Sequence, residues 1–277
     1  MDIRDIILRE KSISMTDVLG IVSFVCAMTR EQILANLSRE IDASSAEEIE
    51  GFIRERKSGK PLAYITKKKE FYSQEFYVDS SVLVPRPETE ILVEEALRML
   101  EQRKDITRVL DMGTGSGAVG LTIARWALRK VVCVDVSRDA ILVARKNAIA
   151  MGLSGQTSFV CCDLFDGIRK GARFGMVLAN LPYVPDEEWA GLMADVRDFE
   201  PRCALCGGPE GAEIYSRFLR SLPSHMKNNG LVLCEVGGAR QASLVGTVLE
   251  SAGFGVTVRN DYTGVERVII GSWTNLS

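Results

Sequence analysis

The sequence is poor in the residues and segments that build metal centres and membrane spans. It has one histidine, His225, and no apolar run of about 18 residues, the length that a membrane helix needs. Cys203 and Cys206 form a CxxC pair, but no second pair and no nearby histidine completes a zinc site. The N-terminus carries acidic residues where a secretion signal carries basic ones. We therefore expect no metal site, no membrane association and a cytoplasmic location.

A strong excess of charge of one sign is also lacking. The chain has 34 lysine and arginine residues against 37 aspartate and glutamate residues, a formal net charge of -3. Proteins that bind nucleic acid mainly by neutralising phosphates usually carry a basic excess. The run of lysines at 67–69 is the one basic cluster, and it is more typical of a solvated turn. Direct nucleic-acid binding is not expected, and a monomer is the default.

The hydrophobic pattern divides the chain into three parts. Residues 1–75 repeat apolar residues at spacings of three and four, which predicts a small all-helical domain. Residues 76–88 alternate apolar and polar residues before two prolines, which predicts a β-hairpin linker. Over 89–277, near-continuous apolar strands alternate with helices, which predicts an α/β domain with a parallel sheet covered on both faces. The last two strands, joined by residues 262–265, are close enough to form an antiparallel hairpin.

A glycine-rich turn follows the first strand of the α/β region. The segment 111–117 reads DMGTGSG and leads into a helix, so a bulky ligand can lie against bare backbone at the helix N-terminus. About 20 residues on, Asp135 ends the second strand, where its two oxygens can hold ribose hydroxyls. A dinucleotide enzyme would show similar features. Glycines at every second residue after Asp111 instead favour S-adenosylmethionine, which has no pyrophosphate to cradle.

The third strand ends in a carboxylate beside two apolar side chains. Asp163 could accept from the amine of an adenine ring while Leu164 and Phe165 pack on its face, although ordinary strand-end packing explains these residues equally well. The predicted cofactor-binding residues are Asp111, Gly113, Thr114, Gly115, Ser116, Gly117, Asp135, Asp163, Leu164, Phe165 and Asn180.

The fourth strand ends in the sequence NLPY, residues 180–183, beside the predicted cofactor turn. An amide or aromatic amine nitrogen is a poor nucleophile because its lone pair is delocalised. The Asn180 side-chain oxygen and the Leu181 carbonyl can each accept one N–H of such an NH2 group and favour its attacking, tetrahedral form. Pro182 would stiffen the loop and Tyr183 would stack on the substrate. We predict these four residues as catalytic, without a general base, which leaves His225 as a surface or core residue.

Six segments of the chain together resemble a known family. They are GKPLAYI at 59–65, VLVPRPETE at 82–90, DMGTGSGA at 111–118, NLPYVP at 180–185, EPRCAL with GGPEG at 200–211, and DYTGVERV at 261–268. These segments are similar to those of the HemK/PrmC-like methyltransferases, which modify the glutamine of the GGQ loop in peptide-chain release factors. The similarity extends over most of the chain.

The resemblance implies a fold, a reaction and a partner. The fold would be a Rossmann-like class I S-adenosylmethionine-dependent methyltransferase, with a seven-stranded sheet whose last strand is antiparallel, plus a small helical domain that helps to hold the release factor. The enzyme would methylate the glutamine N5 nitrogen and leave S-adenosylhomocysteine. Its glutamine contacts would fall on Asn180, Leu181, Pro182 and Tyr183, with Arg86 and Glu88 of the PRPETE segment also binding substrate.

Two alternatives remain at this point. The tetrapeptide NxPY also occurs in adenine-N6 methyltransferases, and Leu181 stands where the release-factor enzymes usually have proline, as in ribosomal RNA adenine dimethyltransferases. An adenine-N6 methyltransferase acting on RNA or DNA is therefore the second hypothesis, and a catalytically silent binding module is the third. The acidic net charge and the PRPETE and GGPEG segments argue against the adenine enzymes.

Overall fold

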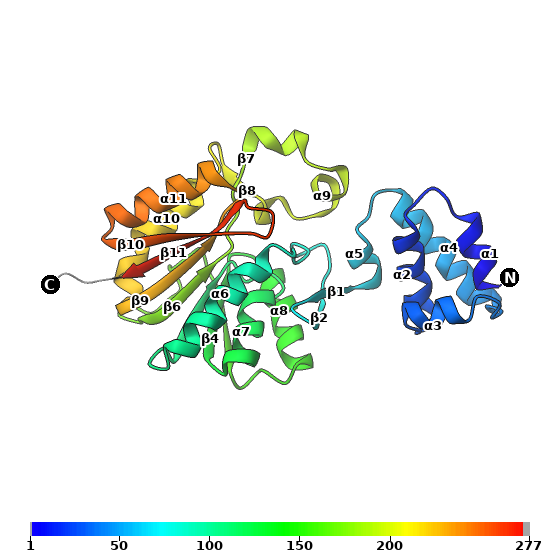
Figure 1. The fold of residues 1–277 in the computed structure, drawn as a ribbon, viewed down its shortest axis with the longest axis horizontal. Helices are drawn as coiled ribbons and strands as arrows, with labels where there is room; N and C mark the ends of the chain where they lie inside the picture. Colours follow the sequence, from blue (N-terminus) through cyan, green and yellow to red (C-terminus); the bar gives the residue numbers. More distant parts are fainter. Residues whose placement is uncertain (1, 274–277) are drawn as a thin grey trace. The chain divides into compact units, whose positions relative to one another are not determined.

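The computed structural model describes residues 2–273, and the chain divides into two compact units (Figure 1). One unit comprises Met1–Lys68 with Leu192–Phe199, and the other comprises Lys69–Gly191 with Glu200–Ser277. The division falls at Lys68, whereas we expected the helical part to extend to residue 75. A short later segment also belongs to the first unit, which the sequence pattern did not indicate.

The first unit is all helical. Asp2, Ser14, Thr29 and Asp42 each cap a helix by accepting a backbone N–H with the side chain. Isoleucine and valine side chains from the helices form one buried cluster. The helices are α1 (Ile3–Arg9), α2 (Met15–Cys26), α3 (Arg30–Ala35), α4 (Ala43–Lys57), α5 (Leu62–Thr66) and, from the later segment, α9 (Ala194–Phe199).

A short hairpin follows the helices. Strands β1 (Lys68–Phe71) and β2 (Gln74–Tyr77) form a two-stranded sheet. Both turn residues, Tyr72 and Ser73, have positive φ (50° and 56°), as a two-residue hairpin turn requires. The hairpin therefore lies earlier than the 76–88 that we predicted, and no strand occurs between residues 78 and 88. The turn has neither glycine nor asparagine, so the usual sequence signal was missing.

The second unit contains a seven-stranded mixed sheet in the order β10-β11-β9-β6-β3-β4-β5. Strand β11 is antiparallel to both of its neighbours, and the remaining pairs are parallel. The predicted sheet with an antiparallel last strand is thus confirmed. The strands are β3 (Arg108–Met112), β4 (Lys130–Asp135), β5 (Thr157–Cys161), β6 (Phe174–Ala179), β9 (Met226–Glu235), β10 (Phe254–Asn260) and β11 (Glu266–Trp273).

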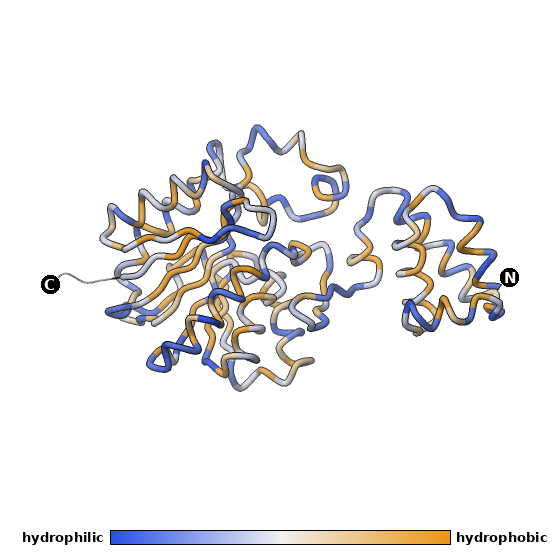
Figure 2. The backbone as a smooth tube through the Cα atoms, in the orientation of Figure 1, coloured by the Kyte–Doolittle hydropathy of each residue, from blue (hydrophilic) through white to orange (hydrophobic). Residues whose placement is uncertain are grey.

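Helices cover both faces of this sheet (Figure 1). On one face lie α6 (Thr89–Gln102), α7 (Ala118–Ala127) and α8 (Arg138–Ala150), and on the other lie α10 (Glu213–Ser221) and α11 (Ala239–Ser251). Every residue of β6 is buried, as expected for a central strand covered on both sides. The hydrophobic colour of the central strands in Figure 2 shows the same pattern.

Short irregular elements lie between strand β6 and helix α10, and one more lies between α10 and β9. Short strands β7 (Val184–Pro185) and β8 (Cys206–Gly208) pair in parallel, and 3-10 helices η1 (Asp186–Gly191), η2 (Arg202–Ala204) and η3 (Leu222–His225) complete the second unit. Within residues 2–273, none of the helices combines the length and the apolar character that crossing a bilayer requires.

Candidate active site

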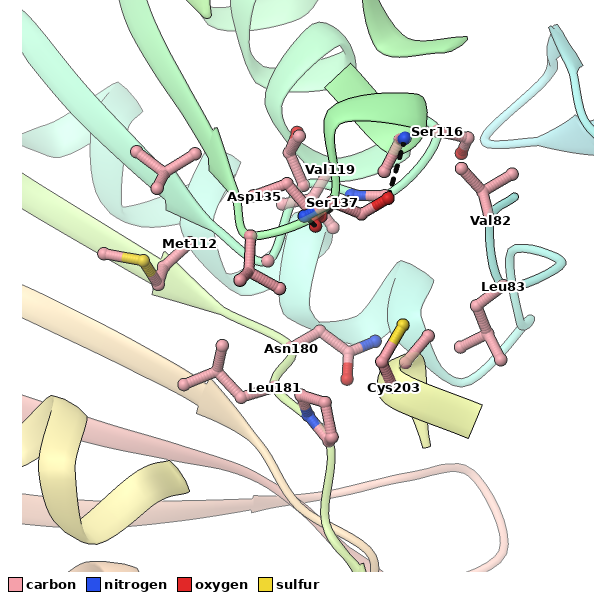
Figure 3. Close-up of a pocket in the computed structure, with 18 of the residues that line it drawn as sticks. Val82, Leu83, Met112, Ser116, Val119, Asp135, Ser137, Asn180, Leu181 and Cys203 are labelled. Carbon is pink, nitrogen blue, oxygen red and sulfur yellow. Dashed lines mark hydrogen bonds between the residues drawn. The ribbon is translucent and has the colours of Figure 1, made fainter. Parts of the chain in front are cut away.

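A pocket opens where the strand order of the sheet reverses. Strand β3 pairs with β4 on one side and with β6 on the other, so the crevice lies at the carboxyl ends of these strands. The pocket is lined from the ends of all three strands, from residues 81–86 and from Cys203 and Ala204 of η2 (Figure 3). Its lining lies entirely within the second unit.

The glycine turn forms one wall of this pocket. Gly113, Gly115 and Gly117 all have positive φ, which favours glycine at each position. The N–H groups of Gly113 and Thr114 both donate to the Val134 carbonyl at 2.9 Å, which fixes the turn against β4. A side chain on Gly117 would collide with Leu121, whereas no heavy atom lies within 4 Å of the position that a Cβ would take on Gly115. Gly115 therefore presents open backbone to the pocket.

Asp111 lies beneath the turn and does not line the pocket. Its side chain is buried, and Oδ2 accepts from Thr114 Oγ1 at 2.5 Å and from the Gly120 N–H at 3.0 Å. Burial raises the pKa of this carboxyl to about 6, against the opposing effect of those two hydrogen bonds. The structure thus gives Asp111 a supporting position rather than the cofactor contact that we predicted. Gly117 likewise turns the chain without lining the pocket.

Asp135 lines the pocket at the end of β4. Its Oδ2 accepts from the Gly115 N–H and its Oδ1 from the Ser137 N–H, both at 2.9 Å (Figure 3). Burial raises the pKa of the carboxyl, and these backbone donors oppose that change. A carboxylate oxygen can accept two hydrogen bonds, so both oxygens keep a lone pair for a ligand. The residue is held in place and remains able to bind a diol.

The three residues after β5 have different surroundings. Asp163 lines the pocket but is ion-paired with Arg217 at 2.5 Å, and Leu164 also lines it, with φ of 46°. Phe165 is buried elsewhere, with its ring stacked on that of His225 at a centroid distance of 4.5 Å. For Phe165, strand-end packing is therefore the better of the two explanations. His225, which is half-buried, contributes to the same packing.

The Asn180 loop forms the opposite wall. Asn180 Nδ2 donates to Thr89 Oγ1 at 3.1 Å, and the Leu181 N–H donates to the Tyr215 hydroxyl at 3.4 Å. Among residues 2–273, no donor bonds to the Asn180 side-chain oxygen or to the Leu181 carbonyl. Asn180, Leu181 and Pro182 all line the pocket. The loop therefore offers two unused acceptors beside the glycine turn.

Of the predicted substrate residues, Tyr183 and Glu88 lie outside the pocket lining, and Arg86 lies within it. The ring of Tyr183 packs against Gly237, where an added Cβ would lie 3.0 Å from Tyr183 Cε2, and Tyr183 does not line the pocket. Burial raises its pKa to about 12. Glu88 is exposed and also absent from the lining, whereas Arg86 lines the pocket and is ion-paired with Glu200 at 2.6 Å. Tyr183 thus lies outside the pocket lining, and its stacking on the substrate stays a prediction.

Comparisons with known proteins agree with this geometry. A methyltransferase domain model matches residues 109–199, and a PrmC N-terminal domain model matches residues 7–66. The release factor glutamine methyltransferase of Clostridium acetobutylicum is 37% identical over 253 residues, which cover 90% of this chain and 88% of that protein. The chain belongs to this family. Its resemblance to the HemK/PrmC-like enzymes is thereby confirmed, and it is an enzyme of the methyltransferase class.

Other relatives extend the match. The release factor glutamine methyltransferase of Chlorobaculum tepidum is 36% identical over 255 residues, covering 89% of this chain and 86% of that protein. A methyltransferase structure from Pyrococcus furiosus has a TM-score of 0.54 at 17% identity, and the match covers 81% of this chain and 98% of that one. The second comparison shows the fold alone, which agrees with the predicted Rossmann-like methyltransferase class.

In this member of the release factor glutamine methyltransferase family, the GGPEG segment supports the Asn180 loop directly. The Tyr183 and Val184 N–H groups both donate to the Leu205 carbonyl, at 3.0 and 2.8 Å. A Cβ on Gly207 would lie 2.6 Å from the Pro182 carbonyl oxygen, and one on Gly211 would collide with the Tyr183 carbonyl oxygen. The sequence showed these glycines as a family segment but gave no reason for them. The reason is backbone contact with the Asn180 loop.

Several residues of the site were not predicted. Glu200 is buried and accepts from the Val84 N–H at 3.1 Å as well as from Arg86, so it joins two segments 114 positions apart. The Tyr215 hydroxyl donates to the Glu235 carbonyl at 2.5 Å and so connects β9 to the Asn180 loop. The sequence signal that could have pointed to Glu235 is a charged residue at the end of an apolar strand, as in LVLCE at 231–235. Among residues 2–273, no cluster of metal-ligating side chains is present.

Proposed function

We propose that the protein transfers a methyl group from S-adenosylmethionine to the side-chain amide nitrogen, N5, of the glutamine in the GGQ motif of peptide-chain release factors. The product of the cofactor would be S-adenosylhomocysteine. One observation carries the proposal: Asn180 and Leu181 line the same pocket as the glycine turn, and among residues 2–273 the Asn180 side-chain oxygen and the Leu181 carbonyl accept no hydrogen bond. Family membership supports the same acceptor group.

The residues around the turn fit S-adenosylmethionine. Gly115 leaves open space against its backbone, Asp135 has two oriented carboxylate oxygens for ribose hydroxyls, and Leu164 offers an apolar contact. The basic residues of the lining, Arg86 and Arg217, are ion-paired with Glu200 and Asp163, which suits a cofactor that has no pyrophosphate to hold. When bound, the cofactor would supply an electrophilic methyl group on a positively charged sulfur.

The chain's own contribution to catalysis would be to place and prepare the amide. The Asn180 oxygen and the Leu181 carbonyl each accept one N–H of the glutamine NH2 group, which reduces delocalisation of the nitrogen lone pair and directs it into the pocket. Val82, Leu83 and Leu181 line the pocket with apolar groups that exclude water (Figure 3). The nitrogen becomes acidic only as the new bond forms, so no base has to act first. Placement would supply most of the rate.

The rest of the chain would serve recognition. We assign the helical domain, predicted as residues 1–75 and matched as a PrmC N-terminal domain over 7–66, to holding the release factor. The Arg86 side chain at the pocket rim would contact the incoming GGQ loop, since its ion pair with Glu200 orients it there. We further propose that the protein works in the cytoplasm as a monomer, where release factors act in translation termination.

The test uses purified protein with methyl-labelled S-adenosylmethionine and three acceptors: a release factor, RNA and DNA. We expect label in the release factor, and mass spectrometry should place one added methyl group on the GGQ-containing peptide. A release factor whose GGQ glutamine is replaced by glutamate should remain unlabelled. Label in RNA or DNA but not in the release factor would refute the proposal in favour of adenine-N6 methylation.

A further inference from the structure

A buried carboxyl lies next to the Asn180 loop but does not line the pocket. Glu235 is the last residue of β9 and is 2% exposed. Its Oε2 atom is buried and has no hydrogen-bond partner among residues 2–273. The side chains of Thr89 and Asn180 both hydrogen-bond toward this carboxyl and lower its pKa. A buried acceptor with unused capacity is costly, so its position beside these two residues calls for a role.

Thr89 connects Asn180 to this carboxyl. The Thr89 Oγ1 atom accepts from Asn180 Nδ2 at 3.1 Å, and the hydroxyl hydrogen is then left to donate to Glu235. Thr89 starts α6, Asn180 directly follows β6, and Glu235 ends β9. They form a short chain of hydrogen bonds: the Asn180 amide donates to the Thr89 hydroxyl, and the Thr89 hydroxyl and the Asn180 side chain both bond to the Glu235 carboxyl, which is the final acceptor.

The direction in which these hydrogen bonds are donated decides whether Asn180 presents its oxygen or its NH2 group to the substrate. The two ends of an asparagine amide have nearly the same shape, so only hydrogen bonds determine which end faces the pocket. A carboxylate can only accept, so it forces the Thr89 hydroxyl to donate toward it and to accept from the Asn180 NH2 group. The Asn180 oxygen is then left for the substrate NH2. A protonated carboxyl could donate instead, and the chain could reverse.

We infer that Glu235 is a positioning residue that keeps the oxygen of the Asn180 amide, rather than its NH2 group, turned toward the substrate. With the chain reversed, the Asn180 NH2 group would meet the substrate NH2 group, donor against donor, and the clamp would be lost. This inference rests on the proposed function, because it requires an acceptor that carries an NH2 group. Glu235 itself touches neither substrate nor cofactor; it acts through Thr89 and Asn180.

The electrostatic surroundings place the switch near neutral pH. Burial raises the pKa of Glu235 to about 7; the Thr89 hydrogen bond and Arg267 lower it, the nearby Glu88 raises it, and Asn180 lowers it. Arg267, from β11, is itself ion-paired with Asp261 at 3.0 Å. The phenols of Tyr183 and Tyr215 also face this region, and burial raises the pKa of both above the ordinary value, so they stay neutral near pH 7.

The first test compares pH profiles at saturating cofactor and release factor. For the wild type, kcat should rise with pH through about 7, because the clamp needs the ionised carboxylate. In Glu235→Gln, the side chain can donate or accept at every pH, so this rise should disappear and kcat at pH 8 should fall at least tenfold. Cofactor affinity and KM for the release factor should change little. Glu95→Gln, which also removes a buried carboxylate of this unit, should keep the wild-type profile.

The second test does not depend on how well Glu235→Gln folds. Thr89→Ser keeps the hydroxyl that connects Asn180 to Glu235, and should retain most of kcat and the pH-dependent rise. Thr89→Val keeps the shape without the hydroxyl, and should lose at least tenfold in kcat while the KM for the release factor is kept. Equal kcat and equal pH profiles in the Ser and Val variants would overturn the inference, as would an unchanged profile in Glu235→Gln.

The same experiments separate this inference from the proposed function. A wild-type protein that labels no release factor refutes the proposed function before any variant is compared. A wild type that labels the release factor, together with Glu235→Gln and Thr89→Val variants that match it across the pH range, refutes only the positioning role of Glu235.

Discussion

The two walls of the pocket are built in different ways. The glycine turn is held by its immediate surroundings in the sheet: Gly113 and Thr114 donate to Val134 of the next strand, and Asp135 accepts from Gly115. Most of its hydrogen bonds come from residues 111 to 137, and Asn147 of the next helix adds one to the Ser116 carbonyl at 2.8 Å. Such a turn can be recognised from one short stretch of sequence because that stretch contains the turn and most of what holds it.

The Asn180 loop is held from a distance. Thr89 accepts from Asn180, the Tyr215 hydroxyl accepts from Leu181, and the glycines at 207 and 211 allow close backbone contact with Pro182 and Tyr183. These supports come from three other parts of the chain. The comparison teaches that the wall proposed for the cofactor is a mainly local structure, whereas the wall proposed for the substrate depends on the tertiary fold. Variants of the first should change cofactor affinity, and variants of the second should change turnover.

The largest effect is expected from Asn180→Ala. The variant removes one of two acceptors of the amide clamp, and loss of one such positioned partner typically costs about 10²- to 10³-fold in kcat. Cofactor affinity, measured by calorimetry, should stay nearly unchanged because the glycine turn is intact. Asn228→Ala, at an exposed position of β9, is the matched control and should behave as wild type. Unchanged turnover in Asn180→Ala would remove the clamp mechanism.

Asp135→Ala should give the converse result. Hydrogen bonds to a charged group contribute about 1.5–3 kcal/mol each, so loss of the two that the carboxylate would make to the ribose hydroxyls should weaken S-adenosylmethionine binding by about 10²-fold or more. Turnover at saturating cofactor should fall much less. The exposed Asp139 offers a control at the next helix, since Asp139→Ala removes a nearby charge without reaching the turn. Calorimetry that showed wild-type affinity for Asp135→Ala would break the comparison between the walls.

Asp111→Asn tests the effect of the buried Asp111 carboxyl on the free energy of unfolding. The folded pKa of Asp111, about 6, lies above its ordinary value of 3.8, so this group stabilises the fold below pH 3.8 and the contribution is lost as pH rises through about 6. Wild type should therefore gain on the order of 2 kcal/mol over the variant between pH 7 and pH 4. Urea unfolding at several pH values measures this difference. Parallel pH dependence of the two proteins would show that Asp111 does not titrate in this range.

The same contrast explains how much could be predicted from sequence. The order of elements, the parallel sheet with its antiparallel end, and the positions of Gly115, Asp135 and Asn180 all followed from local patterns and from the family segments. Asp111 was assigned a ligand contact because its place in the motif gives no information on depth. Whether a strand residue faces the pocket or the core depends on what packs beneath the turn.

The features that the sequence did not reveal share a physical cause, which is that they have no local signature. The hairpin turn at Tyr72 and Ser73 lacks the residues that usually adopt positive φ, so its position was mistaken. Tyr183 was expected to stack on the substrate, but it lies outside the pocket lining, where its ring packs on Gly237, which has no side chain. Glu235 was not predicted because its importance comes from contacts with residues far away in sequence. Such contacts have no local signature.

The smallest effect concerns the glycines that support the Asn180 loop. Gly211 and Gly152 have similar positive φ values, +74° and +70°, so replacing either by alanine brings the same backbone strain. Around Gly152 no heavy atom lies within 4 Å of an added Cβ, whereas at Gly211 it would press on the Tyr183 carbonyl oxygen and lie 3.0 Å from the Pro185 nitrogen. Gly211→Ala should therefore be less stable than Gly152→Ala by about 1–2 kcal/mol, from overpacking alone.

The two glycine variants also test whether the two walls of the pocket are supported separately. The strain in Gly211→Ala is relieved most easily by a shift of the Asn180 loop, so kcat should fall while cofactor affinity remains close to that of Gly152→Ala. Thermal unfolding, calorimetry with S-adenosylmethionine and release-factor methylation measure the three quantities on the same two proteins. If Gly211→Ala instead lost cofactor affinity and kept kcat, the support of the two walls would be shared. The GGPEG segment would then belong to the cofactor site as much as to the substrate site.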